Sequence, residues 1–433
     1  MFRRFTRLAV HFRGYAVLVL GTGLTRGLSL VTAVIIARTG SPTRFGEISV
    51  FLAIVTLWTE GDFLDSTLVR YASAAHNETA RTRYLKAALF LKVAWNVLLL
   101  MLAVPVAWAV SHGVFNKPVL FYAIFVAIVC AVGLNLLSLR AAFFQSQERF
   151  ALYTATTSLF YILAFLFVVA IAVTSVRRDT MPIYYAYLLA TVIVGMFGLV
   201  SIVRIVRRVS LERQVIKRIA SFAGWLLGAN LAYMVTQRLD ILLLTGFASL
   251  AVVGQYGAAL RVVATVSLLT GTLAPALLPR AARARRSPQL LLAYLRHAAP
   301  LSALIILCAG ALWLAVPLVV RVMFGEAYSD AVPIVRILLI GPVCSAMYTP
   351  LSQLFLAQGE PRKMLYLSFL RLGSIATLGV LLIPPLRASG AALAVGLTEA
   401  VALAYVALSL RSQLAAALRV WNAKRLPHEL PAP

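Results

Sequence analysis

The sequence has few acidic residues, little charge of either sign and little cysteine. Only 12% of its 433 residues are charged, and 14 Asp and Glu stand against 40 Lys and Arg. An average soluble domain carries about twice that share of charge, so the composition argues against an ordinary soluble protein. The three cysteines, Cys130, Cys308 and Cys344, fall within apolar runs at unrelated spacings. We expect small core residues there, and neither a disulfide framework nor a metal cluster.

The motifs of soluble enzymes are missing as well. The sequence has no Gly-rich phosphate-binding loop, no zinc-protease helix motif and no nucleophile elbow. The stretches between its apolar runs are too short for a soluble catalytic domain. We therefore expect a protein that is not an enzyme and that has no cofactor and no metal site.

Long apolar runs dominate the chain. Hydrophobic residues make up 61% of it, and the mean hydropathy is +0.91. Because a helix needs about 20 apolar residues to cross a bilayer, we predict an all-α polytopic membrane protein with about twelve transmembrane helices. The expected spans are 14–37, 48–71, 84–110, 118–143, 151–175, 183–206, 220–244, 252–278, 296–320, 332–356, 365–386 and 389–411.

Basic residues are distributed unevenly between the two sides of this map. Most lie on the side of the N-terminus, in runs such as "RIVRRVSLERQVIKR" (204–218) and "RAARARR" (280–286), whereas the loop "TGFASLA" (245–251) on the other side has no charge. The positive-inside rule then places both termini in the cytoplasm. The net charge of +26 reflects this topology, with membrane lipid headgroups as secondary partners and no nucleic acid.

The chain also repeats itself weakly. "RFGEISVF" (44–51) resembles "VVGQYGAA" (252–259), and "FFQSQERFALY" (143–153) resembles "FLAQGEPRKMLY" (355–366). Both offsets are about 210 residues, half the chain, and six helices return the chain to the side where it began. We predict two parallel six-helix lobes, residues 1–209 and 210–433, with a substrate path between them.

Charged residues inside the expected spans are the candidate functional groups. A charge at the bilayer centre costs about 2.5–3.5 kcal/mol, so most of these groups should face an aqueous cavity or one another. The candidate cations for binding an anionic substrate are Arg26, Arg70, Lys92, Arg238, Arg261 and Arg371. The candidate carboxylates for coupling to H⁺ or Na⁺ are Glu60, Asp62, Asp65, Asp240 and Glu399.

Depth and chemistry suggest roles for these groups. Arg26 lies at the depth of Glu60 and Asp62, so these residues are expected to meet, and Asp62 shares a helix face with Asp65. Arginine binds phosphate oxygens through a planar fork, whereas buried carboxylates can take up protons or cations. The alternative is a set of internal salt bridges that only fix helix packing.

Four stretches resemble one transporter family. They are "RFGEISVFLAIVTLWTEGDFLDSTLVRYAS" (44–73), "QRLDILLLTGFASLAVVGQYGAALRV" (237–262), "TLAPALLPRAAR" (272–283) and the region 324–407. The chain resembles the lipid-linked oligosaccharide (O-antigen type) flippases of the multidrug/oligosaccharidyl-lipid/polysaccharide transporter superfamily. The resemblance spans nearly the whole chain, although Phe63 follows Asp62 where the family usually has a glycine after a single acid.

The resemblance implies a bacterial inner-membrane transporter. It would flip an undecaprenyl-diphosphate-linked sugar unit to the periplasmic leaflet by alternating access, together with other polysaccharide-assembly proteins. On that resemblance Arg26, Arg70, Asp240 and Arg261 fall at positions of functional charges. Two alternatives remain: a cation-coupled multidrug exporter of the same superfamily and a membrane polysaccharide polymerase.

Overall fold

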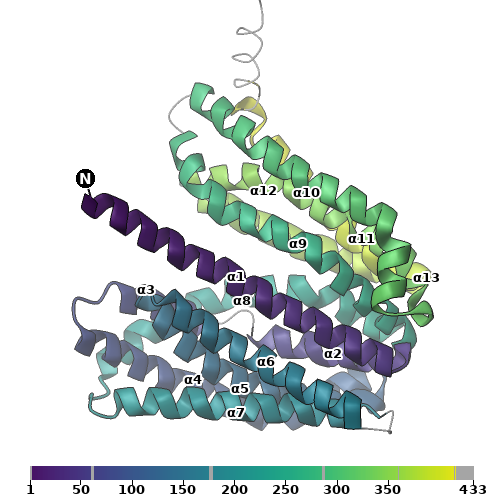
Figure 1. The fold of residues 1–433 in the computed structure, drawn as a ribbon, viewed down its shortest axis with the longest axis horizontal. Coiled ribbons are helices and arrows are strands. Elements are labelled where there is room, and N and C mark those ends of the chain that lie inside the picture. The colour runs from purple at the N-terminus through teal and green to yellow at the C-terminus, as the bar shows by residue number, and fades with distance from the viewer. Residues whose placement is uncertain are drawn as a thin grey trace, which may run out of the picture. The chain divides into compact units, whose positions relative to one another are not determined.

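The computed structural model describes residues 2–59, 63–174, 179–284, 288–358, 360–413 and 415. These residues form helices and contain no strand, which confirms the all-α fold class. The α-helices are α1 (Phe2–Thr39), α2 (Pro42–Thr59), α3 (Phe63–Ser73), α4 (Glu78–Trp108), α5 (Phe121–Ser146), α6 (Phe150–Thr174), α7 (Met181–Val206), α8 (Arg213–Phe247), α9 (Leu250–Ala284), α10 (Pro288–Met323), α11 (Ala331–Leu338), α12 (Ile340–Gln358) and α13 (Pro361–Ser409) (Figure 1). Three short helical turns are η1 (Ala109–Val114), η2 (Pro118–Leu120) and η3 (Glu326–Tyr328).

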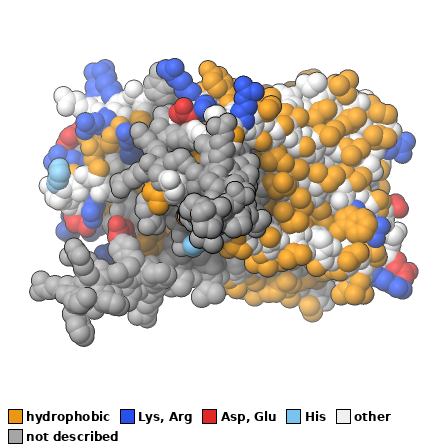
Figure 2. Space-filling view, turned by 90° about the horizontal axis from the view of Figure 1, so that it is seen from above, with side chains coloured by type: hydrophobic (Ala, Val, Ile, Leu, Met, Phe, Trp, Pro, Cys, Tyr) orange, Lys and Arg blue, Asp and Glu red, His pale blue; other side chains and the backbone are white. Residues whose placement is uncertain are grey.

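The helices are built for a lipid environment. Among the described residues, nine helical stretches are long and apolar enough to cross a membrane. Their outward faces carry large apolar side chains, such as Met101 on α4 and Leu307 and Leu314 on α10, which are 70–73% exposed. Hydrophobic side chains cover much of the face shown in Figure 2. Since water would penalise such a surface, the chain is a multi-pass membrane protein.

Two expected spans are each assigned as two helices. The span expected over 332–356 is confirmed as one membrane-crossing stretch, Ala331–Phe355, although the single residue Leu339 separates α11 from α12 within it. Pro342 has no N–H to donate to the Leu338 carbonyl, so the α-helical ladder loses a bond there. The span expected over 48–71 is represented by α2 and α3, which flank residues 60–62, outside the described part of the chain.

The last two expected spans, 365–386 and 389–411, are confirmed. They are assigned together as α13, but Arg387 inside it has the non-helical angles φ 51° and ψ −124°. Arg371 and Glu399 form an ion pair across this point. In a straight helix these residues would be about 42 Å apart at 1.5 Å per residue, so the chain turns back at Arg387.

Contacts divide the chain into two compact units. Unit 1 comprises Met1–Arg238 and Ser249–Gly254, and unit 2 comprises Leu239–Ala248 and Gln255–Pro433. The boundary expected between residues 209 and 210 stays a prediction.

Unit 1 is organised around α5. This helix packs against α2, α3, α4, α6 and α7, and α1 packs along α6 (Figure 1). Small residues on α5, such as Ala127 and Ala131, are fully buried and let the neighbouring helices approach closely. Asn77 caps the start of α4 by accepting a hydrogen bond of 2.7 Å from the Ala80 N–H. The helices around α5 therefore form the frame that holds the site described below.

The first sequence repeat has a structural counterpart within unit 1. A Cβ on Gly46 would lie 1.9 Å from the Leu250 carbonyl oxygen, and a Cβ on Gly254 would lie 1.9 Å from the Pro42 carbonyl oxygen. The first turns of α2 and α9 thus touch backbone to backbone, in a reciprocal contact that only glycine permits. The two glycines occupy corresponding positions in "RFGEISVF" and "VVGQYGAA".

Unit 2 is built on the two arms of α13. They pack against α11 and α12, and α10 covers α11 and α12. The Ser302 hydroxyl donates to the Ala346 carbonyl at 2.7 Å, and the Tyr294 hydroxyl donates to the Pro350 carbonyl at 2.7 Å. These two bonds join α10 to α12, and the second satisfies a carbonyl of the proline-containing helix.

Candidate functional site

A buried ion pair joins α3 to α4 in unit 1. The Lys92 ammonium lies 3.0 Å from Asp65 Oδ1, and its side chain is fully buried while that of Asp65 is 16% exposed. Lys92 also donates to the Ser138 hydroxyl on α5 at 3.3 Å. Two of the predicted site residues therefore meet each other. In this structure Lys92 contacts protein groups and is not exposed to an aqueous cavity.

Two asparagines extend this arrangement. Asn135 Nδ2 donates to Asn96 Oδ1 at 3.1 Å, and Asn96 Nδ2 donates to the Val132 carbonyl at 3.5 Å. The Ser138 hydroxyl donates to the Asn135 carbonyl at 2.9 Å. We call Asp65, Lys92, Asn96, Asn135 and Ser138 the polar cluster. Its bonds cross three helices, so α3, α4 and α5 are held in one register.

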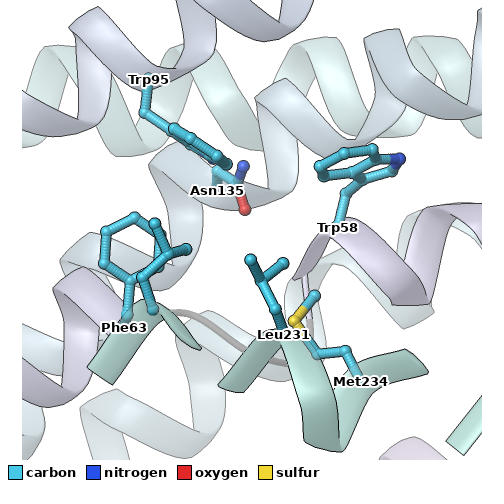
Figure 3. A pocket seen from close by; sticks show the side chains of 7 residues that line it. Trp58, Phe63, Trp95, Asn135, Leu231 and Met234 are labelled. Atoms are coloured by element: carbon cyan, nitrogen blue, oxygen red, sulfur yellow. The ribbon is translucent and has the colours of Figure 1, made fainter. Parts of the chain in front are cut away.

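An aromatic pocket adjoins the polar cluster. This small pocket is partly open to the surroundings, and its lining residues are Trp58, Phe63, Trp95, Asn135, Leu227, Leu231 and Met234 (Figure 3). Asn135 belongs to both the pocket and the polar cluster, and Trp95 and Lys92 lie three residues apart on α4. We use the name aromatic pocket for these seven residues.

The helices that form the pocket come from distant parts of the sequence. Leu227, Leu231 and Met234 recur at helical spacing and so share one face of α8. On the other side, the rings of Phe63 and Trp95 are 5.5 Å apart and nearly perpendicular. This edge-to-face contact fixes both rings as a preformed wall.

Unit 2 contains a second intramembrane ion pair. Arg371 pairs with Glu399 on the opposite arm of α13, and Glu399 is 8% exposed. The Tyr348 hydroxyl on α12 donates to Glu399 Oε2 at 2.7 Å. This carboxylate is therefore held by a cation and a hydroxyl, which is how a buried charge is stabilised in a membrane.

A carboxylate also joins α8 to α9. Asp240 is 7% exposed, and its Oδ2 accepts a hydrogen bond of 2.6 Å from the Tyr256 hydroxyl. Arg238 and Arg261, on the same two helices, are half-buried. Tyr256 belongs to the "GQY" stretch that contributed to the family resemblance, and its partner Asp240 is one of the predicted acids.

The remaining predicted residues lie elsewhere in unit 1. Arg26 is exposed on α1. Arg70 is exposed on α3, with its guanidinium 4.1 Å from the centre of the Phe222 ring, a cation–π contact. Glu60 and Asp62 lie outside the described residues, so the pairing of either with Arg26 stays a prediction.

Sequence reasoning missed the neutral polar residues. The cost of charge in a bilayer singles out charged residues only, and so it does not point to Asn96, Asn135, Tyr256 or Tyr348. An amide inside an expected span is also costly unless it is hydrogen-bonded, and this signal would have found both asparagines.

Of the cysteines, Cys130 is buried as expected, whereas Cys308 and Cys344 are only partly buried, and all three are free. The described residues contain no cluster of three or more metal-ligating side chains.

The fold is that of known transporters. A multidrug resistance MATE family transporter of the MOP superfamily, in an inward-facing conformation, is similar with a TM-score of 0.74 and 17% identity over 90% of this chain and 96% of that one. The lipid II flippase MurJ is similar with a TM-score of 0.72 and 12% identity over 93% and 90%. A MOP superfamily transporter from Pyrococcus furiosus has a TM-score of 0.60 and 16% identity over 93% and 94%. At these identities the likeness establishes the class: an α-helical membrane protein with the MOP transporter fold.

The sequence adds the family. Residues 12–285 match the model of the polysaccharide biosynthesis protein family. The chain therefore belongs to that family, as its motifs led us to expect. A comparison with curated protein sequences gave no match.

Proposed function

We propose that the protein flips a lipid-linked oligosaccharide, carried on undecaprenyl diphosphate, from the cytoplasmic to the periplasmic leaflet of the bacterial inner membrane. The observation that carries this proposal is the polysaccharide biosynthesis family match over residues 12–285, on a fold shared with a lipid II flippase. Both termini would lie in the cytoplasm, and the two lobes would alternate access to the substrate.

The charges within the spans support an anionic substrate. Basic residues are in excess, and we assign the exposed Arg26 and Arg70 to binding the diphosphate. Arg238 and Arg261 are half-buried, and we assign them to the same task. A guanidinium suits this role because it stays charged and binds two phosphate oxygens at once.

Lys92 and Arg371 take a different part in the proposal. Each is paired with a carboxylate, Asp65 and Glu399 respectively. A pair of this kind changes partners when the carboxylate takes up a proton or a sodium ion. We therefore propose that these two pairs, together with Asp240, couple transport to H⁺ or Na⁺. Lys92 and Arg371 would then bind the substrate once their carboxylate partners have released them.

Complementation of a strain that lacks its own flippase tests the proposal. Arg26→Ala and Arg261→Ala should each reduce polymer production at normal expression, whereas Arg26→Lys should restore part of it. Arg321→Ala is the matched control, because Arg321 is 71% exposed and pairs with the exposed Glu326. Full polymer production by both Arg→Ala variants would overturn the role of these cations.

The same strain separates the alternatives. A flippase defect should leave the lipid-linked intermediate on the cytoplasmic face, whereas a polymerase defect would leave unpolymerised units on the periplasmic face. A multidrug exporter would instead change drug sensitivity when deleted and leave the polymer unchanged. Either of the last two results would refute the proposed function.

A further inference from the structure

Helix α5 contains an arginine that has no carboxylate partner. Arg140 lies six residues before the end of α5 at Ser146, within the stretch Pro118–Ser146 that is apolar enough to cross a membrane. It forms no ion pair with any described residue, and the neighbouring charge that acts on it is a second cation, Arg149. Because a charge within a span is costly unless it is compensated, an anion from outside the chain would stabilise it here.

Phe144 holds both arginines at the end of α5. The Arg140 guanidinium carbon lies 4.0 Å from the centre of the Phe144 ring, and the Phe144 carbonyl accepts a hydrogen bond of 3.1 Å from the Arg149 backbone N–H. Glu148 closes the turn between them with a left-handed φ of 58°. A guanidinium stacked on a ring uses its flat face, so the N–H groups on its edge stay available to a ligand.

The protein leaves these N–H groups unused. Arg140 donates no hydrogen bond to a described residue; its Nε is occluded, whereas its two Nη atoms are not. The Nη atoms are therefore the donors that a ligand can reach. Arg149 is exposed, and the carboxylate of the same turn, Glu148, forms no ion pair with a described residue.

The start of α6 adds positive potential at the same place. This helix of 25 residues begins at Phe150, directly after Arg149. The Arg149 carbonyl accepts the Tyr153 N–H at 3.0 Å, so the N–H groups of residues 150–152 precede the first bond of the helix. Free N–H groups and the helix dipole both favour an anion, and here they coincide with two guanidinium groups.

The internal repeat indicates that the fold does not need a cation at this position. Phe143 corresponds to Phe355 in the two matching stretches, so Arg140 corresponds to Ser352. Ser352 is 3% exposed, and its hydroxyl donates to the Thr349 carbonyl at 2.9 Å. A small residue that satisfies itself locally fills the place in unit 2. Binding of an anion therefore explains the arginine of unit 1 better than packing does.

We propose that Arg140, Arg149 and the first turn of α6 bind the phosphate group of a membrane lipid. Arg140 lies about 9 Å from the end of its helix, so its long side chain reaches the level of the lipid headgroups on the expected cytoplasmic side. Two sources share this chemistry: an anionic phospholipid and a polyprenyl diphosphate. The site goes beyond the proposed function, since neither arginine is among the charges assigned to the substrate; only the second source rests on that function.

Native mass spectrometry of the full-length protein in a neutral detergent tests the site, because it counts bound lipids and gives their affinities. The probes are phosphatidylglycerol, farnesyl diphosphate, the zwitterionic phosphatidylcholine and inorganic pyrophosphate, which has no lipid chain. We expect one molecule of phosphatidylglycerol or of farnesyl diphosphate to bind about tenfold more tightly than phosphatidylcholine, as one charge-assisted hydrogen bond would provide.

The variants locate this binding. Arg140→Gln should weaken the affinity for the anionic lipid about tenfold. Arg149→Gln should also weaken it, and it tests the site even if Arg140→Gln folds poorly, because Arg149 is exposed. Arg149→Lys should restore part of the affinity. Arg207→Gln is the matched control: it removes the same charge from another exposed position on the same expected side and should leave the affinity unchanged.

The pattern of losses identifies the source. If the two Gln variants weaken only farnesyl diphosphate, the ligand is the polyprenyl diphosphate; if they weaken only phosphatidylglycerol, it is a phospholipid. Four results would overturn the site: no preference over phosphatidylcholine, unchanged affinity in both Gln variants, an equal loss in Arg207→Gln, or binding of pyrophosphate alone.

Complementation keeps this test separate from the proposed function. If the protein restores polymer production but no lipid binds through Arg140 and Arg149, only the phosphate site is wrong. If a lipid binds through these arginines but complementation fails, the site stands and the proposed function is wrong.

Discussion

Removing the ammonium of Lys92 should destabilise unit 1 strongly. In Lys92→Met the side chain keeps its length, but Asp65 loses its ion-pair partner at 3.0 Å in a largely buried site. Breaking a buried pair costs about 3–5 kcal/mol. We expect the lower end, about 3 kcal/mol, because the Asp65 side chain keeps 16% exposure. The double variant Lys92→Met/Asp65→Leu removes both charges and should lie within about 1 kcal/mol of the wild type.

Thermal unfolding of the purified protein, followed by tryptophan fluorescence, measures this effect. A loss of 3 kcal/mol corresponds to a midpoint lowered by roughly 6–12 °C for units of this size. The control Arg321→Ala, which breaks the exposed pair with Glu326, should leave the midpoint nearly unchanged. The reasoning fails if Lys92→Met unfolds at the wild-type temperature, or if the double variant is less stable than the single one.

Three further substitutions test the packing and the polar contacts. Gly46→Ala should disrupt the contact between α2 and α9, because its Cβ would lie 1.9 Å from the Leu250 carbonyl oxygen. The control is Gly310→Ala, which should express and melt like the wild type because its Cβ would meet no atom within 4 Å. Arg387→Gly should raise the melting temperature slightly, since the left-handed conformation at φ 51° costs an L-residue about 1 kcal/mol; a lowered temperature would show that the side chain matters more. Tyr256→Phe should destabilise the protein by about 1.5–3 kcal/mol by removing the hydroxyl bonded to Asp240, and an unchanged midpoint would contradict that bond.

The sequence predicted the helices well where apolar length decides the answer. The turn between 365–386 and 389–411 was expected from span length, and the ion pair between Arg371 and Glu399 confirms it. The span expected over 332–356 is confirmed as well, since Ala331–Phe355 is long and apolar enough to cross a membrane. Hydropathy does not locate the interruption at Leu339 within it, because hydropathy is a sum over many residues, whereas an interruption is decided at single peptide groups such as that of Pro342, which has no N–H.

The candidate site was predicted only in its parts. The cost of charge in a bilayer correctly singled out Asp65 and Lys92 as residues in need of partners. Depth along the spans paired Arg26 with the acids of 60–62 and did not suggest the contact between Asp65 and Lys92. Rotation about the helix axis, set by how α3, α4 and α5 pack, decides which of several residues at similar depth touch.

The sequence by itself determined that this protein is helical, lies in a membrane and belongs to the polysaccharide biosynthesis family, because composition, span length and motif are local properties of the chain. Only the tertiary structure decided that Lys92 pairs with Asp65 and that Asn135, whose Oδ1 has no hydrogen-bond partner among the described residues, lines the aromatic pocket. These contacts join residues from α2, α3, α4, α5 and α8, and the free energy that fixes them comes from packing between helices that are distant in the sequence.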